Sequence, residues 1–270
     1  MGNNTLKSSV GMGQKIAFGF GMLANQMFPA ALGVFIIVLV QDLGFAALLW
    51  GIIQFAPRIF DAITDPLMGF ISDNTKSKWG RRRQYVFIGG ILMGLAYVAM
   101  WQLYEDDGII YNFIYFFSWS LVFYLGLTIF SVPYVAMGYE ISDDFHERTQ
   151  IMAIAQFIGQ WAWVIAPWFW VILYDPAWFP DGAGQGVRDL SIWVAIPCTI
   201  FAIIPAIFIK SKSTLNRKDF LPVNSSYISK SIKGIFISAF EAFKIKQFKK
   251  IAFATFLIFN SFQVIAAFTF

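Results

Sequence analysis

The sequence contains few of the residues that build disulfides, histidine metal sites and thiol active sites. Cys198 is the only cysteine and His146 the only histidine among 270 residues. One cysteine excludes an internal disulfide, and one histidine excludes a histidine-cluster metal site. Cys198 lies in an apolar segment and His146 in a polar loop, so a cysteine nucleophile with a histidine base is not favoured. Because no nucleophile and base are placed to meet, we do not expect an enzyme.

Charged residues are also scarce. They make up 13% of the chain and hydrophobic residues 58%, whereas soluble domains have about 25% and about 45–50%. The apolar runs are continuous and lack the two-residue alternation of a membrane β-barrel. The sequence therefore predicts an all-α integral membrane protein. Its net charge of +4 comes without a basic face carrying interleaved aromatic residues, so no nucleic-acid partner is expected.

Six apolar segments are long enough to cross a bilayer as helices, for which roughly 20 residues suffice. Lysine and arginine concentrate at the N-terminus and in alternate loops, including 76–83, whereas the loop at 104–108 is acidic. The positive-inside rule therefore places the N-terminus in the cytoplasm. The expected spans are residues 15–40, 45–71, 85–103, 110–138, 151–174 and 190–209.

The chain divides into three parts by composition. Residues 1–209 form the six-helix bundle, and residues 210–250 form a cytoplasmic linker with ten lysines and arginines. Within this linker, residues 228–248 have apolar side chains at helical spacing, which predicts an amphipathic helix on the membrane surface. Residues 251–270 begin a seventh apolar run that continues to Phe270, so we expect a truncated chain. This order is typical of the first half of a twelve-span transporter.

Ionisable side chains interrupt the second span. Arg58, Asp61 and Asp65 are three and four residues apart, so they project from one face of a helix. A carboxylate at mid-membrane costs about 2.5–3.5 kcal/mol on insertion scales, and such groups usually face a bundle interior or a wet cavity. One arginine cannot neutralise two carboxylates, and the remaining negative charge predicts a bound cation. The alternative is that Arg58 neutralises one carboxylate and the cluster only holds helices together.

Two blocks of residues carry a family resemblance. The first block comprises Arg58, Asp61, Asp65, Pro66, Gly69, Asn74, Thr75, Trp79, Gly80, Arg81 and Arg82, and the second comprises Val132, Pro133, Tyr134, Glu140, Asp143, Glu147, Arg148 and Thr149. These blocks resemble the motifs of the glycoside/pentoside/hexuronide:cation symporters, the melibiose-permease group of the major facilitator superfamily. Residues 15–21 are similar to the first helix of that family.

The resemblance implies a fold, a function and a cation site. The fold is the N-terminal six-helix half of a major facilitator, with the linker and the start of helix 7. The function is symport of a sugar or glycoside-like solute with Na⁺, H⁺ or Li⁺ across the bacterial inner membrane. We expect a monomer surrounded by membrane lipid, with no cofactor or metal beyond the monovalent cation. The resemblance makes Asp61 and Asp65 the cation-binding carboxylates and Thr64 and Thr128 the neutral oxygen ligands.

The solute site matches the family less closely. Acidic, tryptophan and arginine positions of sugar-transporting relatives are occupied here by Gln26, Ser131, Val135 and Gln156. The amides of Asn25 and Gln26 suit hydrogen bonds to a ligand or a neighbouring helix, and Trp161 and Trp163 lie deep enough in their span to stack on a ligand. The candidate substrate-binding residues are Gln26, Asn25, Ser131, Tyr134, Gln156 and Trp161.

Two alternatives to sugar transport remain open. The 31 phenylalanines leave room for a more apolar solute. Some animal relatives in the wider family carry lysolipids, so an amphiphile is the rival substrate. A protein of another class, a non-transporting sensor or scaffold, would instead use the basic linker to contact partners or anionic lipid.

The loop after the second span resembles the superfamily's cytoplasmic gate, in which acidic and basic groups of adjacent loops hold the inward side closed. Lysine and arginine are expected in any cytoplasmic loop, but Gly69 and Asp73 at the helix end favour a gate. The candidate gate residues are Arg58, Gly69, Asp73, Arg81, Arg82, Arg83, Glu140, Asp143 and Arg148.

Overall fold

The computed structural model describes residues 10–209, 214, 234, 237 and 240–269. These residues form two compact units, Met1–Phe220 and Leu221–Phe270. Every regular element in the described part is helical, which confirms the predicted all-α fold. The elements of the first unit are α1 (Met12–Gln41), α2 (Ala47–Asp73), α3 (Arg83–Met100), the short 3₁₀ helix η1 (Glu105–Asp107), α4 (Ile109–Glu140), α5 (Phe145–Leu173) and α6 (Ala183–Phe208).

Five of these helices, α1, α3, α4, α5 and α6, are long and apolar enough to cross a membrane. The remaining one, α2, is 27 residues long, but Arg58, Asp61 and Asp65 lie within it and lower its mean hydropathy. All six expected spans are thus helices. By length and composition, the first unit is a multi-pass membrane bundle.

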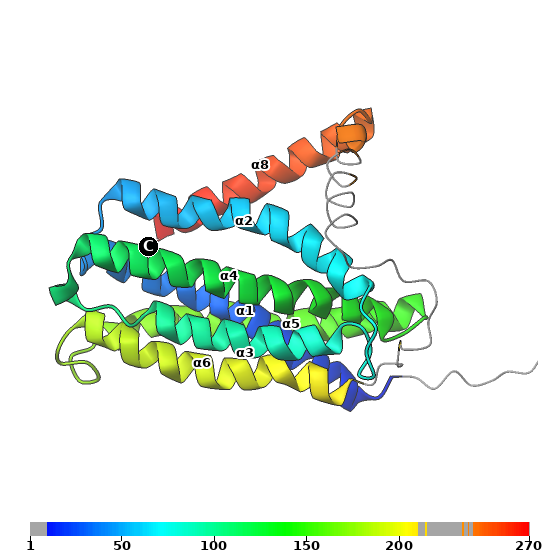
Figure 1. The fold of residues 1–270 in the computed structure, drawn as a ribbon, viewed down its shortest axis with the longest axis horizontal. Helices are drawn as coiled ribbons and strands as arrows, with labels where there is room; N and C mark the ends of the chain where they lie inside the picture. The colour runs from blue at the N-terminus through cyan, green and yellow to red at the C-terminus, as the bar shows by residue number, and fades with distance from the viewer. Residues whose placement is uncertain (1–9, 210–213, 215–233, 235–236, 238–239, 270) are drawn as a thin grey trace, which may run out of the picture. The chain divides into compact units, whose positions relative to one another are not determined.

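The helices pack in pairs. α3 packs along α4 and α1 along α5, and α6 joins the two pairs by contacting both α1 and α3. Small residues allow this close approach: a Cβ added to Gly126 of α4 would lie 2.7 Å from the backbone nitrogen of Met93 in α3. α2 rests mainly on α4 and barely touches α1, and Figure 1 shows it along one side of the bundle. This arrangement leaves much of α2 uncovered by the unit.

An aromatic cluster fills the core between α1, α3 and α4. The rings of Tyr97 and Phe28 lie 5.1 Å apart, and Trp101 lies 5.5 Å from Phe35 and 5.1 Å from Phe116, all edge to face. These five side chains are fully buried. Edge-to-face pairs add to the stabilisation that burial alone provides, so the cluster helps to hold α1, α3 and α4 together.

The helices α5 and α6 begin well before the predicted starts of their spans. α5 begins at Phe145 rather than at residue 151, because the Asp144 side chain caps it by accepting a 2.8 Å hydrogen bond from the backbone N–H of Glu147. α6 begins at Ala183 rather than at residue 190. The residue before it, Gly182, has a φ of 95° and forms the turn into the helix. Caps and packing, rather than the limits of the apolar run, set these ends.

The second unit contains α8 (Lys246–Thr269), the apolar run expected to start at residue 251. The predicted amphipathic helix over residues 228–248 lies largely outside the described residues. Where the chain is described again, a turn at Phe243 and Lys244 separates a helical segment from α8. Most of the predicted linker, residues 210–250, also lies outside the described part.

Candidate functional site

The polar residues of α2 form one of three faces on that helix. At 3.6 residues per turn, Ile53, Pro57 and Met68 share the buried face. Leu48, Ile52, Phe55, Ile59 and Ile63 form an exposed apolar stripe. Between these two faces lie the polar side chains of Gln54, Arg58, Asp61 and Asp65.

Three of the four predicted cation ligands lie together where α2 meets α4. The Thr128 hydroxyl donates a 2.8 Å hydrogen bond to Oδ1 of Asp65. The hydroxyl oxygens of Thr64 and Thr128 lie 3.4 Å apart, and that of Thr64 lies 3.1 Å from the carbonyl of Phe60. Thr128 is buried, whereas Asp65 is exposed. The group therefore offers carboxylate and hydroxyl oxygens at the edge of the bundle.

Asp61 is one helical turn from Asp65. Its Oδ1 is buried and makes no hydrogen bond within the described part of the chain. Arg58 makes no ion pair within 4.0 Å with either carboxylate. A buried acceptor without a donor is costly, and the structure does not supply the close pairing on which the purely structural alternative depends.

These oxygens fit a small hard cation. When Thr128 donates its proton to Asp65 and Thr64 donates to Phe60, the two hydroxyl oxygens turn lone pairs toward each other. A cation between them would relieve this contact, and the unpartnered oxygen of Asp61 lies one helical turn away on α2. Oxygen donors are the preferred ligands of hard cations. Asp61, Asp65, Thr64 and Thr128 are the residues that would hold the ion.

A cluster of ion pairs joins the end of α2, the α2–α3 loop and the end of α4. Arg81 pairs with Glu140, and Arg82 pairs with Asp73. Arg82 also lies 3.0 Å from Glu140, so Glu140 receives both arginines. The Arg82 side chain is only 10% exposed, and a charge this buried needs its acidic partners. Four of the predicted gate residues are therefore in contact.

The structure does not bring the other predicted gate residues into this cluster. Arg58 lies four turns along α2 from Asp73. Arg83 donates instead to the carbonyls of Ala206 (2.7 Å) and Ile207 (3.1 Å) at the end of α6. Gly69 lies against Val132 of α4, and a Cβ added to it would be 3.8 Å from that side chain. Asp143 is exposed in the α4–α5 loop, and Arg148 lies in the first turns of α5.

Three polar side chains meet on the α1–α5 face. The Gln26 amide nitrogen donates to the Gln156 amide oxygen at 3.1 Å, and the Trp163 indole donates to the Gln26 amide oxygen at 2.7 Å. Gln156 and Trp163 are exposed and Gln26 is half-buried. Two predicted substrate residues, Gln26 and Gln156, are thus hydrogen-bonded to each other, and Trp163 joins the cluster through Gln26. Gln156 and Trp163 are seven residues apart, which places both on one helix face. This spacing is the sequence signal that could have indicated Trp163 as a member of the cluster.

The remaining predicted substrate residues lie elsewhere. Tyr134 is fully buried, and its hydroxyl donates to the Phe18 carbonyl at 2.5 Å, so it joins α4 to α1 in the core. Asn25 makes a weak contact of 4.0 Å with the Met22 sulfur, and Ser131 is half-buried in α4. Trp161 is 50% exposed, and at two residues from Trp163 it projects from another side of α5.

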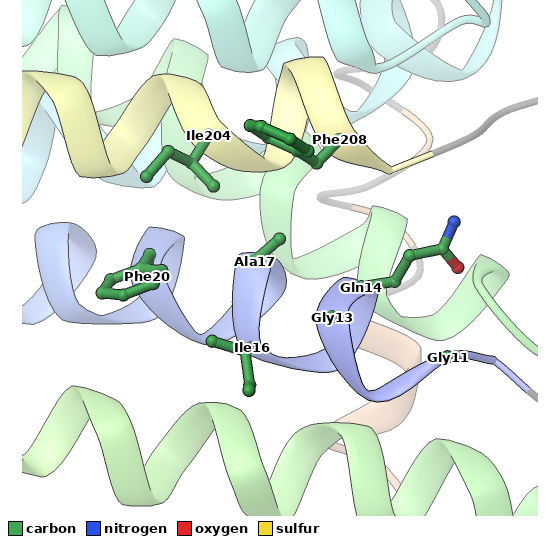
Figure 2. Close-up of a pocket in the computed structure, with 8 residues that line it drawn as sticks. All are labelled: Gly11, Gly13, Gln14, Ile16, Ala17, Phe20, Ile204 and Phe208. Carbon is green, nitrogen blue, oxygen red and sulfur yellow. The ribbon is translucent and has the colours of Figure 1, made fainter.

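Two pockets lie at the basic end of the bundle, which holds the α2–α3 and α4–α5 loops. One, of about 570 Å³, is lined by the end of α4 and the first turns of α5, from Tyr139 and Arg148 to Gln156 of the amide cluster. The other, of about 750 Å³, lies between the start of α1 and the end of α6 (Figure 2). It contains no predicted site residue and is lined mainly by apolar side chains, including Ile16, Phe20, Ile204 and Phe208.

Glu147 forms a link between α1 and α5 that sequence reasoning missed. It accepts a 2.6 Å hydrogen bond from the backbone N–H of Val10 and a 2.5 Å bond from the Ser142 hydroxyl. Lys15 of α1, which is buried, lies 3.9 Å from Glu147 and donates to Gln150 at 3.2 Å. In the sequence, only the second family-like block singled out Glu147, and it did not indicate the contact with α1.

Comparison with known proteins identifies the family of the chain. A family model described as MFS/sugar transport protein matches residues 17–263. An uncharacterized symporter of Synechocystis sp. is 28% identical over 188 residues, which cover 67% of this chain and 34% of that protein. The lactose permease of Leuconostoc lactis is 27% identical over 83% of this chain and 37% of its own length.

A third relative is named for a different solute. The sodium-dependent lysophosphatidylcholine symporter 1 of Xenopus tropicalis is 30% identical over 53% of this chain and 27% of its own length. The chain spans about a third of the length of the curated relatives that it matches. The helical bundle and the family match together define a multi-pass membrane protein of the transporter class. The chain belongs to the MFS/sugar transport protein family, which confirms the resemblance to the cation symporters.

Proposed function

We propose that this chain forms the cation-binding half of a secondary active transporter that couples Na⁺, or alternatively H⁺ or Li⁺, to the uptake of a small solute. The observation that carries the proposal is the oxygen cluster at the α2–α4 contact. Thr128 orients Asp65 at 2.8 Å, Thr64 lies beside it, and Asp61 retains a buried oxygen with no donor among the described residues. A monovalent cation would neutralise part of this negative charge.

The position of the cluster supports a coupling role. α2 carries Asp61 and Asp65 in its middle and Asp73 at its end, where Asp73 joins the ion pairs with Arg82. A small shift of α2 on α4 would therefore affect both the cation ligands and the gate. In an alternating-access cycle, a cation that stabilises one packing of α2 also stabilises the solute-binding form. By linkage, solute and cation must raise each other's affinity by the same factor.

For the solute, we favour a sugar or glycoside. The α1–α5 cluster offers amide groups, and the relatives include a lactose permease. A lysolipid is the second candidate, because one relative is a lysophosphatidylcholine symporter and the exposed stripes of α2 and α5 are apolar. We further propose that the basic end faces the cytoplasm and that the protein lies in a bacterial inner membrane, since lysine and arginine gather at that end.

Uptake by the intact protein in proteoliposomes tests the coupling. A neutral glycoside, a hexuronide and lysophosphatidylcholine are each offered with and without an inward Na⁺ gradient, and again with a proton gradient. We expect either the Na⁺ or the proton gradient to drive accumulation of one of these solutes. Asp65→Asn should abolish this gradient-driven accumulation. Asn keeps the shape and one oxygen of Asp but removes its charge.

Ser120→Ala is the matched control, because Ser120 is a buried hydroxyl of α4 whose one hydrogen bond among the described residues is to the carbonyl of Phe117 in its own helix. Gradient-driven uptake that survives Asp65→Asn undiminished would contradict the cation site. Cation-dependent binding without flux would favour a sensor or scaffold over a transporter.

A further inference from the structure

The groove between the start of α1 and the end of α6 is hollow because small residues line one of its walls. Gly13 and Ala17, one turn apart, form the α1 wall (Figure 2). Ile204 and Phe208, also one turn apart, form the α6 wall. Gly13 is exposed, and a Cβ added to it would have no atom within 4 Å. A larger side chain at position 13 would therefore enter the hollow of about 750 Å³.

The groove has an apolar end and a polar end. Phe20 lies at the apolar end, where its ring stacks on that of Phe201 of α6 at 5.1 Å. Gly13 and Phe20 are seven residues apart, which corresponds to about 10 Å of helix. Figure 2 shows the Gln14 amide at the Gly11 end, away from Phe20. This amide forms no hydrogen bond with another described residue, so the polar end has a side chain that is able to bind a ligand.

The groove is open to the surroundings of the bundle. Ile16 is 40% exposed and Phe208 is 61% exposed, although both side chains are large and apolar. α1 and α6 are each long and apolar enough to cross a membrane, so lipid is the medium around their apolar surfaces. The atoms that line an unfilled groove lose dispersion contacts. An acyl chain, which is narrow, apolar and flexible, restores these contacts.

Positive charge predominates in the two stretches that form the walls. Residues 1–41 and 190–218 contain no aspartate or glutamate, and four lysines and arginines follow α6 in the second stretch. Arg83 adds a guanidinium at the end of α6, where it donates to two backbone carbonyls. Glu147 contacts the chain just before α1, but it lies 3.9 Å from Lys15, which balances its charge. A basic end next to a lipid-facing groove favours an anionic headgroup.

We propose that this groove is a binding site for an anionic phospholipid, whose acyl chain lies between α1 and α6 and whose headgroup lies at the polar end beside Gln14. The site is separate from the candidate cation ligands and from the amide cluster, because neither contributes a lining residue. The phospholipid is thus a bound partner of the bundle and not its transported solute. It fills the space between the two helices, so its binding stabilises their contact.

Native mass spectrometry of the intact, delipidated protein tests the site. Phosphatidylglycerol is titrated as the probe, and phosphatidylcholine with the same acyl chains is the zwitterionic comparison. We expect the tightest phosphatidylglycerol site of the wild type to bind at least tenfold more tightly than phosphatidylcholine. Gly13→Leu places a side chain in the groove and should weaken phosphatidylglycerol binding about tenfold.

Gly33→Leu is the matched control. Gly33 is also an exposed glycine of α1 with no atom within 4 Å of an added Cβ, but it does not line the groove. Its affinity for phosphatidylglycerol should stay within twofold of wild type. Gln14→Glu tests the headgroup without filling the groove, because the carboxylate has nearly the shape of the amide and adds a negative charge. Phosphatidylglycerol binding should weaken at least fivefold, and phosphatidylcholine binding should change less than twofold.

Three results would overturn the proposal. The first is phosphatidylglycerol binding to Gly13→Leu as tightly as to the wild type. The second is tighter binding of lysophosphatidylcholine than of phosphatidylglycerol, which would indicate a single-chain amphiphile. The third is a protein dimer that Gly13→Leu abolishes, because a second copy would then fill the groove. Binding is measured here without transport, so these outcomes do not depend on the proposed function.

Discussion

The hydroxyl of Thr128 on α4 donates to the carboxylate of Asp65 on α2 across 2.8 Å. This bond joins α2, which rests mainly on α4, to the centre of the bundle. Thr128 is 3% exposed, so its oxygen is fixed by packing, whereas Asp65 is exposed. A buried hydroxyl thus orients an exposed carboxylate, and the orientation of the ligand depends on how α2 sits on α4.

Thr128→Val tests this relationship. Valine keeps the volume of threonine but removes the hydroxyl, so Asp65 loses a donor and the cation loses a ligand. Hydrogen bonds to charged groups contribute about 1.5–3 kcal/mol. We expect the cation concentration for half-maximal uptake to rise at least tenfold, since about 1.4 kcal/mol corresponds to a factor of ten. Thr128→Ser, which keeps the hydroxyl, should recover most of the affinity. Equal effects of valine and serine would show that volume, not the oxygen, matters.

Glu140 should couple energetically to Arg81. Both side chains are partly exposed, and exposed ion pairs contribute roughly 0.2–1 kcal/mol. A double-mutant cycle with Arg81→Gln and Glu140→Gln, read by thermal unfolding of the purified protein, should show a coupling free energy of this size. The same cycle with Arg83→Gln and Glu140→Gln should be additive, because Arg83 contacts carbonyls of α6 and not Glu140. A coupled Arg83 and an additive Arg81 would contradict the observed pairing.

Arg83 should support the end of α6. Its guanidinium donates to two carbonyls of the last turn, where a positive charge also interacts favourably with the helix dipole. We expect Arg83→Met, which keeps much of the stem, to lower the free energy of unfolding by about 1–2 kcal/mol. Arg83→Lys should restore part of the loss. Hydrogen exchange measured at Ile207 and Phe208 should increase in the methionine variant, and unchanged exchange there would contradict this role.

Gly126→Ala should disturb the α3–α4 contact. The added Cβ would lie 2.7 Å from the Met93 backbone nitrogen, which a rotamer change cannot relieve. Overpacking typically costs about 1–3 kcal/mol, so we expect a clear fall in the thermal unfolding temperature. Gly33→Ala in α1 is the control, because no atom lies within 4 Å of its added Cβ; there, the higher helix propensity of alanine should leave stability equal or slightly greater. A Gly126→Ala protein as stable as the wild type would show that α3 and α4 can separate without cost.

The positions of the membrane helices could be predicted from the sequence because hydropathy and loop charge act locally. The ends of these helices were predicted less accurately than their positions. α5 and α6 begin before their apolar runs, since an aspartate cap and contacts with neighbouring helices decide where a helix starts.

The candidate cation site was partly predictable. Asp61 and Asp65 are neighbours on one helix, and their spacing alone places them on one face. The contact of Asp65 with Thr128 comes from packing between α2 and α4, and only the family resemblance indicated it. Tyr134 shows the opposite outcome: it occurs in a family-like motif, yet its ring is fully buried and its hydroxyl bonds to the Phe18 carbonyl.

The sequence by itself determined that this is a helical membrane protein, which end is basic, and that two carboxylates share a helix within the membrane. These properties follow from the order of the residues and from the geometry of a single helix. The tertiary structure decided which side chains meet: Thr128 with Asp65, Glu140 with Arg81 and Arg82, and Gln26 with Gln156 and Trp163. Such contacts join residues about 60 to 140 positions apart, and they exist only once small residues such as Gly126 and Gly159 have let the helices approach.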